Sequence, residues 1–150
     1  MGDLEIRDAT AADLPAIVAM LADDPLGAQR ESLHDLTPYR TALQHLEADP
    51  NQHLVVAVRE GRVIGTLQLT VIPGLSHRGA TRALIEAVRI HADERGGGLG
   101  SRLIEWAIGT SRDLGCRMVQ LTSDKTRTDA HRFYERLGFT ASHEGFKLRL

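Results

Sequence analysis

Glycines 96, 97, 98 and 100 lie close together in the stretch DERGGGLGSRLIEWA. An amphipathic pattern with a helical period follows them, so this turn stands at the start of a helix. The first amides of a helix have no intrahelical partner, and the helix dipole makes that end partly positive. Glycine also lets the backbone approach a ligand closely. The stretch predicts a phosphate or pyrophosphate site, with Arg95 and Arg102 adding positive charge; a plain connector between a strand and a helix is the alternative.

Two common nucleotide motifs do not match this turn. A Walker loop needs a lysine after its glycines, and no lysine follows here. A dinucleotide-binding GxGxxG turn would need a third glycine where the chain has Ser101 or Leu103. That turn also follows the first strand of a βαβ unit, whereas a hairpin pattern precedes this one. A nucleotide-binding α/β module is therefore disfavoured, and preferential binding of ATP or NAD would revive it.

The composition predicts one globular domain over residues 1–150, since 42% of the residues are hydrophobic and 25% are charged. A net charge of -2 gives no reason to expect nucleic acid or a membrane as a partner. The single cysteine, Cys116, cannot form an internal disulfide, and the N-terminal sequence does not resemble a signal peptide. Both observations predict a cytoplasmic protein. The histidines lack the spacing of metal ligands, so no metal is expected.

Hydrophobic periodicity predicts a mixed α/β chain. Strands are expected at residues 4–7, 53–58, 62–72, 83–92 and 116–123, with one or two more within 139–150. Helices are expected at residues 10–21, 39–48, 100–114 and 129–137. Hairpins early in the chain and strand–helix units later imply a mixed sheet with helices packed on it. The glycine-rich turn would then follow a central strand that is apolar on both faces.

Two motifs together resemble the GNAT superfamily, the Gcn5-related N-acetyltransferases. The pattern Arg95-x-x-Gly98-x-Gly100 is similar to the acyl-CoA-binding motif of that family. Further along, DAHRFYERLGF at residues 129–139 is similar to the A-x-x-F-Y-E-x-L-G-F signature of its last helix. The order of the expected elements also matches from end to end. The resemblance implies the GNAT fold: a mixed central sheet of six to seven strands, splayed in the middle, with about four helices packed on it.

The resemblance also implies a place for acetyl-CoA as cosubstrate. Its pantetheine arm would lie in the splayed gap and pair with the backbone of Val88 and Ile90, much as an added strand would. Its pyrophosphate would bind the backbone amides of the glycine-rich turn. The residues of this turn are Arg95, Gly96, Gly97, Gly98, Leu99, Gly100 and Ser101.

Tyr134 holds the position of the family's usual general acid. A phenol near the sulfur could donate a proton to the leaving thiolate. Helical periodicity by itself equally allows a core aromatic on one stripe with Phe133 and Leu137. Arg127 stands seven residues before Tyr134, where many family members have an asparagine that touches the pantetheine. This departure puts that contact in doubt, and Arg127 could instead reach the 3′-phosphate of CoA or belong to a solvated face.

Glu86 is the candidate general base. Strand alternation places it on one face with Leu84, Val88 and Ile90, where an apolar setting would favour uptake of a proton from an ammonium. An ion pair with Arg89, or an exposed position in the splayed gap, is the alternative.

The acceptor would meet the segments that vary most within the family, which are residues 24–39 and 73–82 here. They carry acidic, basic and histidine side chains, a lining compatible with an amine on a small molecule or a peptide. No acyl-enzyme nucleophile lines the motifs, so direct transfer in a ternary complex is expected. A non-catalytic acyl-CoA-binding sensor or interaction protein is the alternative function, and a homodimer remains open beside a monomer.

Overall fold

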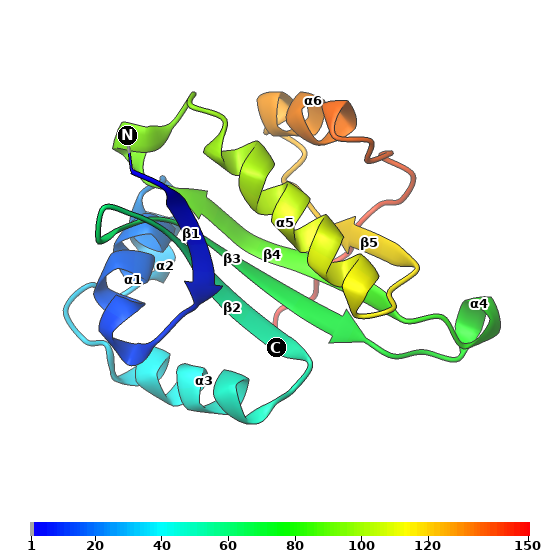
Figure 1. The fold of residues 1–150 in the computed structure, drawn as a ribbon, viewed down its shortest axis with the longest axis horizontal. Coiled ribbons are helices and arrows are strands. Elements are labelled where there is room, and N and C mark those ends of the chain that lie inside the picture. Colours follow the sequence, from blue (N-terminus) through cyan, green and yellow to red (C-terminus); the bar gives the residue numbers. More distant parts are fainter. Residues whose placement is uncertain (1) are drawn as a thin grey trace. The chain divides into compact units, whose positions relative to one another are not determined.

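The computed structural model describes residues 2–150, which form two compact units divided between Gln120 and Leu121. The first unit contains most of the secondary structure (Figure 1). The second contains α6 (Thr128–Arg136) and the chain that flanks it. The last strand, β5 (Met118–Leu121), crosses the division.

A five-stranded sheet organises the first unit, with the strands in the order β1-β2-β3-β4-β5. Its other strands are β1 (Leu4–Asp8), β2 (Gln52–Arg59), β3 (Arg62–Ile72) and β4 (Arg82–Ile90). The pairs β1–β2, β2–β3 and β3–β4 are antiparallel. Glu60 and Gly61 form the tight turn of the β2–β3 hairpin with positive φ at both positions, so the hairpin prediction is confirmed.

Helices cover both faces of this sheet. On one face, α5 (Leu99–Asp113) packs against β3 and β4, and an added Cβ at Gly65 of β3 would lie only 3.0 Å from Leu103 Cδ1. The opposite face meets α1 (Leu14–Ala22) and α3 (Thr37–Ala48). The shared core is fully buried and consists of aliphatic side chains such as Ile64, Leu67, Leu69, Leu103 and Ile104.

Four shorter helices lie in the connections. They are the 3-10 helices η1 (Ala11–Asp13) and η2 (Ala92–Glu94) and the single-turn helices α2 (Gly27–Arg30) and α4 (Ser76–Gly79). The described residues thus contain six α-helices where about four were expected. Both additional helices are four residues long, too short to give a periodic hydrophobic pattern.

The expected sheet of six to seven strands is wrong for the described residues, which form five strands. The missing strands were expected within residues 139–150, where the structure has no strand. Phe146 and Leu148 alternate there as in a strand, but their side chains are 93% and 87% exposed. Alternation alone does not make a strand, because a strand also needs a hydrogen-bonded neighbour.

Candidate functional site

The glycine-rich turn joins η2 to α5 and adopts a backbone that favours glycine. Gly96 and Gly98 have φ values of 83° and 82°, in the left-handed region, and Gly98 is the N-cap residue of α5. An added Cβ would meet no atom within 4 Å at either position. Backbone conformation therefore explains these two glycines, and the surface above them is open to a ligand.

The N-terminus of α5 has amides available for an anion. The amide of Arg102 donates to the carbonyl of Gly98 at 3.2 Å, which is the first backbone hydrogen bond of the helix. No side chain caps this end of the helix. The preceding amides, of Leu99, Gly100 and Ser101, have no helical carbonyl to bind. With the dipole of a 15-residue helix behind them, they form an anion-binding end that fits a phosphate group.

Arg95 lies at the entrance of this turn and pairs with an acid of the first helix. Its Nη2 lies 3.2 Å from Asp23 Oδ2, and both side chains are more than half exposed. An exposed pair of this kind contributes about 0–1 kcal/mol to stability. Arg95 is therefore held loosely and can turn toward an incoming anion at little cost.

A β-bulge interrupts β4 just before the turn. Glu86 pairs with Gln68 and Arg89 with Thr66, so two residues of β4, Ala87 and Val88, stand opposite a single residue of β3. Ala87 takes a φ of 53°, which is unusual for a residue with a side chain. The bulge changes which side chains share a face for the rest of the strand.

Glu86 does not lie among apolar neighbours as expected. Its side chain is exposed, and the bulge puts Ile90 on the opposite face, paired with Gly65. Glu86 instead shares its face with Leu84 and Arg89. These two residues pair with Thr70 and Thr66 of β3, which lie on the same face of the sheet as Gln68, the partner of Glu86. The prediction of an apolar setting is therefore wrong, because strict alternation fails across a bulge. Arg89 does not pair with Glu86 either; its Nη2 lies 3.4 Å from Asp24 Oδ2.

Tyr134 lies in α6, in the unit that follows Gln120. Its half-buried ring makes edge contacts with Phe133 and Phe139, with centroids 5.1 and 5.9 Å apart. The backbone carbonyl of Tyr134 accepts hydrogen bonds from the amides of Leu137 and Phe139, which closes the helix before Gly138. These contacts fix the ring direction, and a fixed ring suits both interpretations of Tyr134, general acid and packed aromatic.

Arg127 is the N-cap residue of α6 and is exposed. An arginine has no side-chain acceptor, so it cannot cap the helix as an asparagine would. The turn before it is instead closed by Asp124, whose Oδ1 accepts from the amide and the hydroxyl of Thr126. Arg127 therefore leaves the N-terminus of α6 without a side-chain cap.

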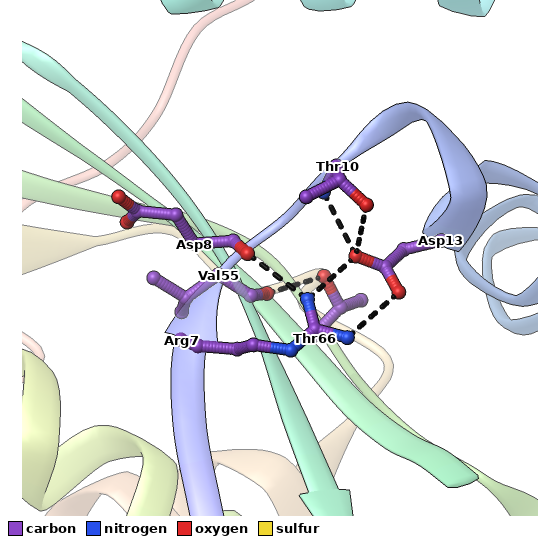
Figure 2. A network of polar contacts seen from close by, with 6 residues as sticks. All are labelled: Arg7, Asp8, Thr10, Asp13, Val55 and Thr66. Atoms are coloured by element: carbon purple, nitrogen blue, oxygen red, sulfur yellow. Dashed lines mark hydrogen bonds and ion pairs between the residues drawn. The ribbon is translucent and has the colours of Figure 1, made fainter. Parts of the chain in front are cut away.

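Another network sets the start of α1. Figure 2 shows Arg7 at the end of β1 donating from both terminal nitrogens to the carboxylate of Asp13, at 2.8 and 3.1 Å. The amide of Thr10 donates to the same carboxylate at 2.8 Å. The Arg7 guanidinium, together with the Thr10 amide, holds the pKa of Asp13 below its usual range. This buried carboxylate anchors the helix that faces β4.

A cavity of about 150 Å³ lies between α1, α3 and the sheet. Its floor includes Thr66 and Gln68 of β3 and the bulge residue Ala87. Tyr39 of α3 lies at its wall, where its hydroxyl donates to Glu31 Oε1 and accepts from the Ser32 amide. Burial raises the pKa of Tyr39, which keeps this hydroxyl protonated.

Residues 15–139 match the family model described as Acetyltransferase (GNAT) family. The chain belongs to the GNAT acetyltransferases. An aminoalkylphosphonate N-acetyltransferase of Salmonella typhimurium is 32% identical over 142 residues, which cover 95% of this chain and 88% of that protein. A glucosamine 6-phosphate N-acetyltransferase of Trypanosoma brucei brucei is 36% identical over 60% of this chain and 59% of that protein.

A solved structure shares the fold of this chain. A crystal structure described as a transcriptional regulator from Bacillus halodurans C-125 has a TM-score of 0.95 and 46% identity. The match covers 99% of this chain and 100% of that chain. The family resemblance drawn from the two motifs is confirmed by the match of residues 15–139 to the family model.

Within this GNAT chain, the structure groups some of the predicted site residues and separates others. The residues predicted to bind the cofactor from Val88 to Ser101 are continuous along the end of β4, η2 and the start of α5. Tyr134 and Arg127 belong to the second unit. Among residues 2–150, no cluster of three or more histidine, cysteine or acidic side chains could hold a metal ion. No helix in the same range has the length and apolarity needed to cross a membrane.

Sequence reasoning missed Gln68, Thr66 and Ala87, which line the cavity. A weak signal existed, since Thr66, Gln68 and Thr70 are alternate polar residues within an otherwise aliphatic strand. Polar residues at period 2 usually mark a solvent-facing side. Here that side is covered by α1 and α3, so Thr66 is buried and donates to the carbonyl of Val55 at 2.9 Å (Figure 2).

Proposed function

We propose that this GNAT protein transfers an acetyl group from acetyl-CoA to the primary amine of a small molecule, directly and in a ternary complex. The observation that carries the proposal is the glycine-rich turn, with its open, left-handed glycines at the N-terminus of α5. The turn follows β4 and η2, and the bulge in β4 locally releases the backbone of that strand from regular pairing. Acetyl-CoA would supply the activated acetyl thioester.

The residues of the first unit fit the cofactor in two places. The amides of residues 95–101 would bind the pyrophosphate, with Arg95 exchanging Asp23 for the phosphate oxygens. The backbone of Val88 and Ile90 would pair with the pantetheine amides as a strand does. Both side chains are half-buried and lie on the strand that leads into the turn.

Two side chains would move protons. Tyr134 would donate its phenolic proton to the thiolate as it leaves. Glu86, which is exposed, would accept a proton from the acceptor ammonium, directly or through water. An acyl-enzyme route has little support, because burial raises the pKa of the Cys116 thiol and disfavours the thiolate nucleophile.

The acceptor is proposed to be a small amine that also carries an acidic group. Two relatives of this chain are named for such compounds, an aminoalkylphosphonate and glucosamine 6-phosphate. The segment after β3 offers the exposed side chains of His77 and Arg78 in α4, which can donate hydrogen bonds to a phosphonate or phosphate. Their consecutive φ values of 54° and 61° are unusual for residues with side chains, and such backbone strain is frequent at ligand sites.

Calorimetric titration with acetyl-CoA, with ATP and NAD as controls, tests the cofactor site. We expect micromolar binding of acetyl-CoA alone, followed by thiol release on adding an aminoalkylphosphonate or an amino sugar phosphate. Tight binding without thiol release across a broad amine panel would instead support a non-catalytic acyl-CoA sensor. The absence of acetyl-CoA binding would reject both functions.

A further inference from the structure

The segment FKLRL, at residues 146–150, has an apolar and a basic side chain in strict alternation. In chain order its residues are Phe146, Lys147, Leu148, Arg149 and Leu150. In an extended backbone this alternation places the two kinds of side chain on opposite faces. All three apolar side chains are at least 87% exposed. Single exposed hydrophobic residues are ordinary on a protein surface, but three in so short a segment indicate an interaction site.

The segment has no bonded partner in its own chain. Its five residues make no hydrogen bond or ion pair within residues 2–150. The residues just before it do make contacts: Glu144 Oε2 lies 3.2 Å from Lys125 Nζ, and an added Cβ at Gly145 would lie 3.7 Å from Thr122 Cγ2. The chain is therefore held as far as Gly145, and the backbone that follows is free to add to the edge of a sheet.

β1 offers such an edge. It is the outer strand on one side of the five-stranded sheet and pairs only with β2 (Figure 1). Alternate amides and carbonyls of β1 therefore face away from the sheet. Leu4 and Ile6 are half-buried, and the exposed carboxylates of Asp3 and Glu5 alternate with them. Neither carboxylate forms an ion pair within the described range.

The apolar side of β1 lies on the face of the sheet that α5 covers. Ile6 pairs with Ala57, and Ala57 pairs with Gly65, whose added Cβ would lie 3.0 Å from Leu103 of α5. Because α5 packs on β3 and β4, it leaves Ile6 only half-buried. A further strand outside β1, with its apolar side on this face, would extend the same apolar surface.

The strand at the other edge of the sheet, β5, matches the segment less well. Its residues are Met118, Val119, Gln120 and Leu121. None of these is acidic, so a basic segment added to β5 would meet no opposite charge from the strand. Opposite charges directly across two strands stabilise the pair, and like charges destabilise it. Charge complementarity therefore selects β1.

We propose that residues 146–150 add, as an antiparallel strand, to the free edge of β1 in a second copy of this chain. The pairs in the register that we assign are Phe146–Ile6, Lys147–Glu5, Leu148–Leu4 and Arg149–Asp3. In this register each apolar side chain meets an apolar one, and each basic side chain meets an acid. A shift by one residue would set apolar side chains against charged ones, so the register is strongly specified.

The exchange is expected in both directions. A stable protein interface buries about 1,200–2,000 Å² in total, more than one five-residue segment can cover. Two copies that each give a segment and each receive one double the contact and close into a symmetric dimer. Addition in one direction only would leave a free edge at each end and would build open chains instead.

Charge reversal tests the register at exposed positions, where the fold should be kept. Lys147→Glu and Glu5→Lys each set like charges opposite one another at both contacts of the dimer, and the double variant restores opposite charges. By sedimentation of the full chain over a concentration series, we expect each single variant to raise the dimer Kd about 10- to 100-fold. The double variant should return close to the wild-type Kd. Arg40→Glu, at an exposed position on α3, is the matched control and should leave the Kd unchanged.

A wild-type chain that stays monomeric throughout the series would overturn the inference. So would a Lys147→Glu variant that associates like the Arg40→Glu control, or a double variant that does not recover. Recovery of Lys147→Glu by Asp3→Lys instead of Glu5→Lys would show a parallel strand and reject the antiparallel register. Association that Lys147→Glu weakens and Glu5→Lys leaves unchanged would reject β1 as the receiving strand.

Discussion

The glycine at the start of α5 can be tested against a matched glycine at its other end. Gly98 and Gly115 share a φ of 82°, and an added Cβ meets no atom within 4 Å at either position. Alanine at a left-handed position costs about 1–2 kcal/mol. Gly98→Ala and Gly115→Ala should therefore lower the free energy of unfolding by the same amount, a fall of about 2–8 °C in Tm for a chain of this length.

Only Gly98→Ala should affect the cofactor. Relief of the strain at position 98 would turn the amides of Leu99 and Gly100 away from the phosphate that they are proposed to bind. One hydrogen bond to a charged group contributes about 1.5–3 kcal/mol, so the Kd for acetyl-CoA should rise about 10- to 150-fold. Gly115→Ala should bind acetyl-CoA like the wild type.

Calorimetric titration and thermal unfolding of the three proteins measure the two effects separately. Equal Kd values for the two variants would refute the proposal that the turn holds the pyrophosphate. Unequal losses of stability would refute the treatment of the two glycines as a matched pair, and a new control would then be needed from the same helix.

Three further predictions concern the fold, the chemistry and self-association. Asp13→Asn should lower the free energy of unfolding by about 1.5–3 kcal/mol at neutral pH, since it breaks the pair with Arg7, whose side chain is partly exposed. The lowered pKa of Asp13 means that this stabilisation is present above about pH 4 and is lost as the pH falls through the folded-state pKa. The free energy of unfolding of Asp13→Asn should therefore change less with pH in this acidic range than that of the wild type. Tyr134→Phe should lower kcat about 10²- to 10⁴-fold without changing the Kd for acetyl-CoA, and unchanged turnover would contradict the assigned role. Because alternate apolar side chains are exposed at Phe146 and Leu148, we expect this segment to pair with a second copy, and replacing both by serine should lower the mass seen by light scattering; a monomeric wild type would be the contrary result.

The parts of the site that depend on local sequence were the parts that the sequence predicted. A glycine-rich turn before an amphipathic helix is set by nearby residues, because positive φ and free helical amides are local properties. The structure places left-handed glycines at 96 and 98 and begins α5 at Leu99, close to the expected start. The motif around Tyr134 could likewise be recognised in the sequence, and it lies on the expected helix.

The face of Glu86 could not be read from its own strand. The bulge at Ala87 arises from the pairing of β4 with β3, two segments whose register is fixed by the whole sheet. One extra residue in one strand moves every later side chain to the other face. A pattern of alternation cannot contain that information, so the expected apolar setting of Glu86 was wrong and the exposed alternative was right, while the prediction of the strand itself was confirmed.

The cavity between α1, α3 and the sheet was decided by tertiary structure alone. Gln68 is held by Gln52, sixteen residues earlier in the sequence, and the space above it is enclosed by helices that come before either strand. The same holds for residues 139–150, where alternation is local but the partner of a strand is not. The sequence by itself determined the glycine-rich turn at the start of α5, because positive φ and free helical amides are local properties, and only the packing of distant segments decided which side chains line the cavity.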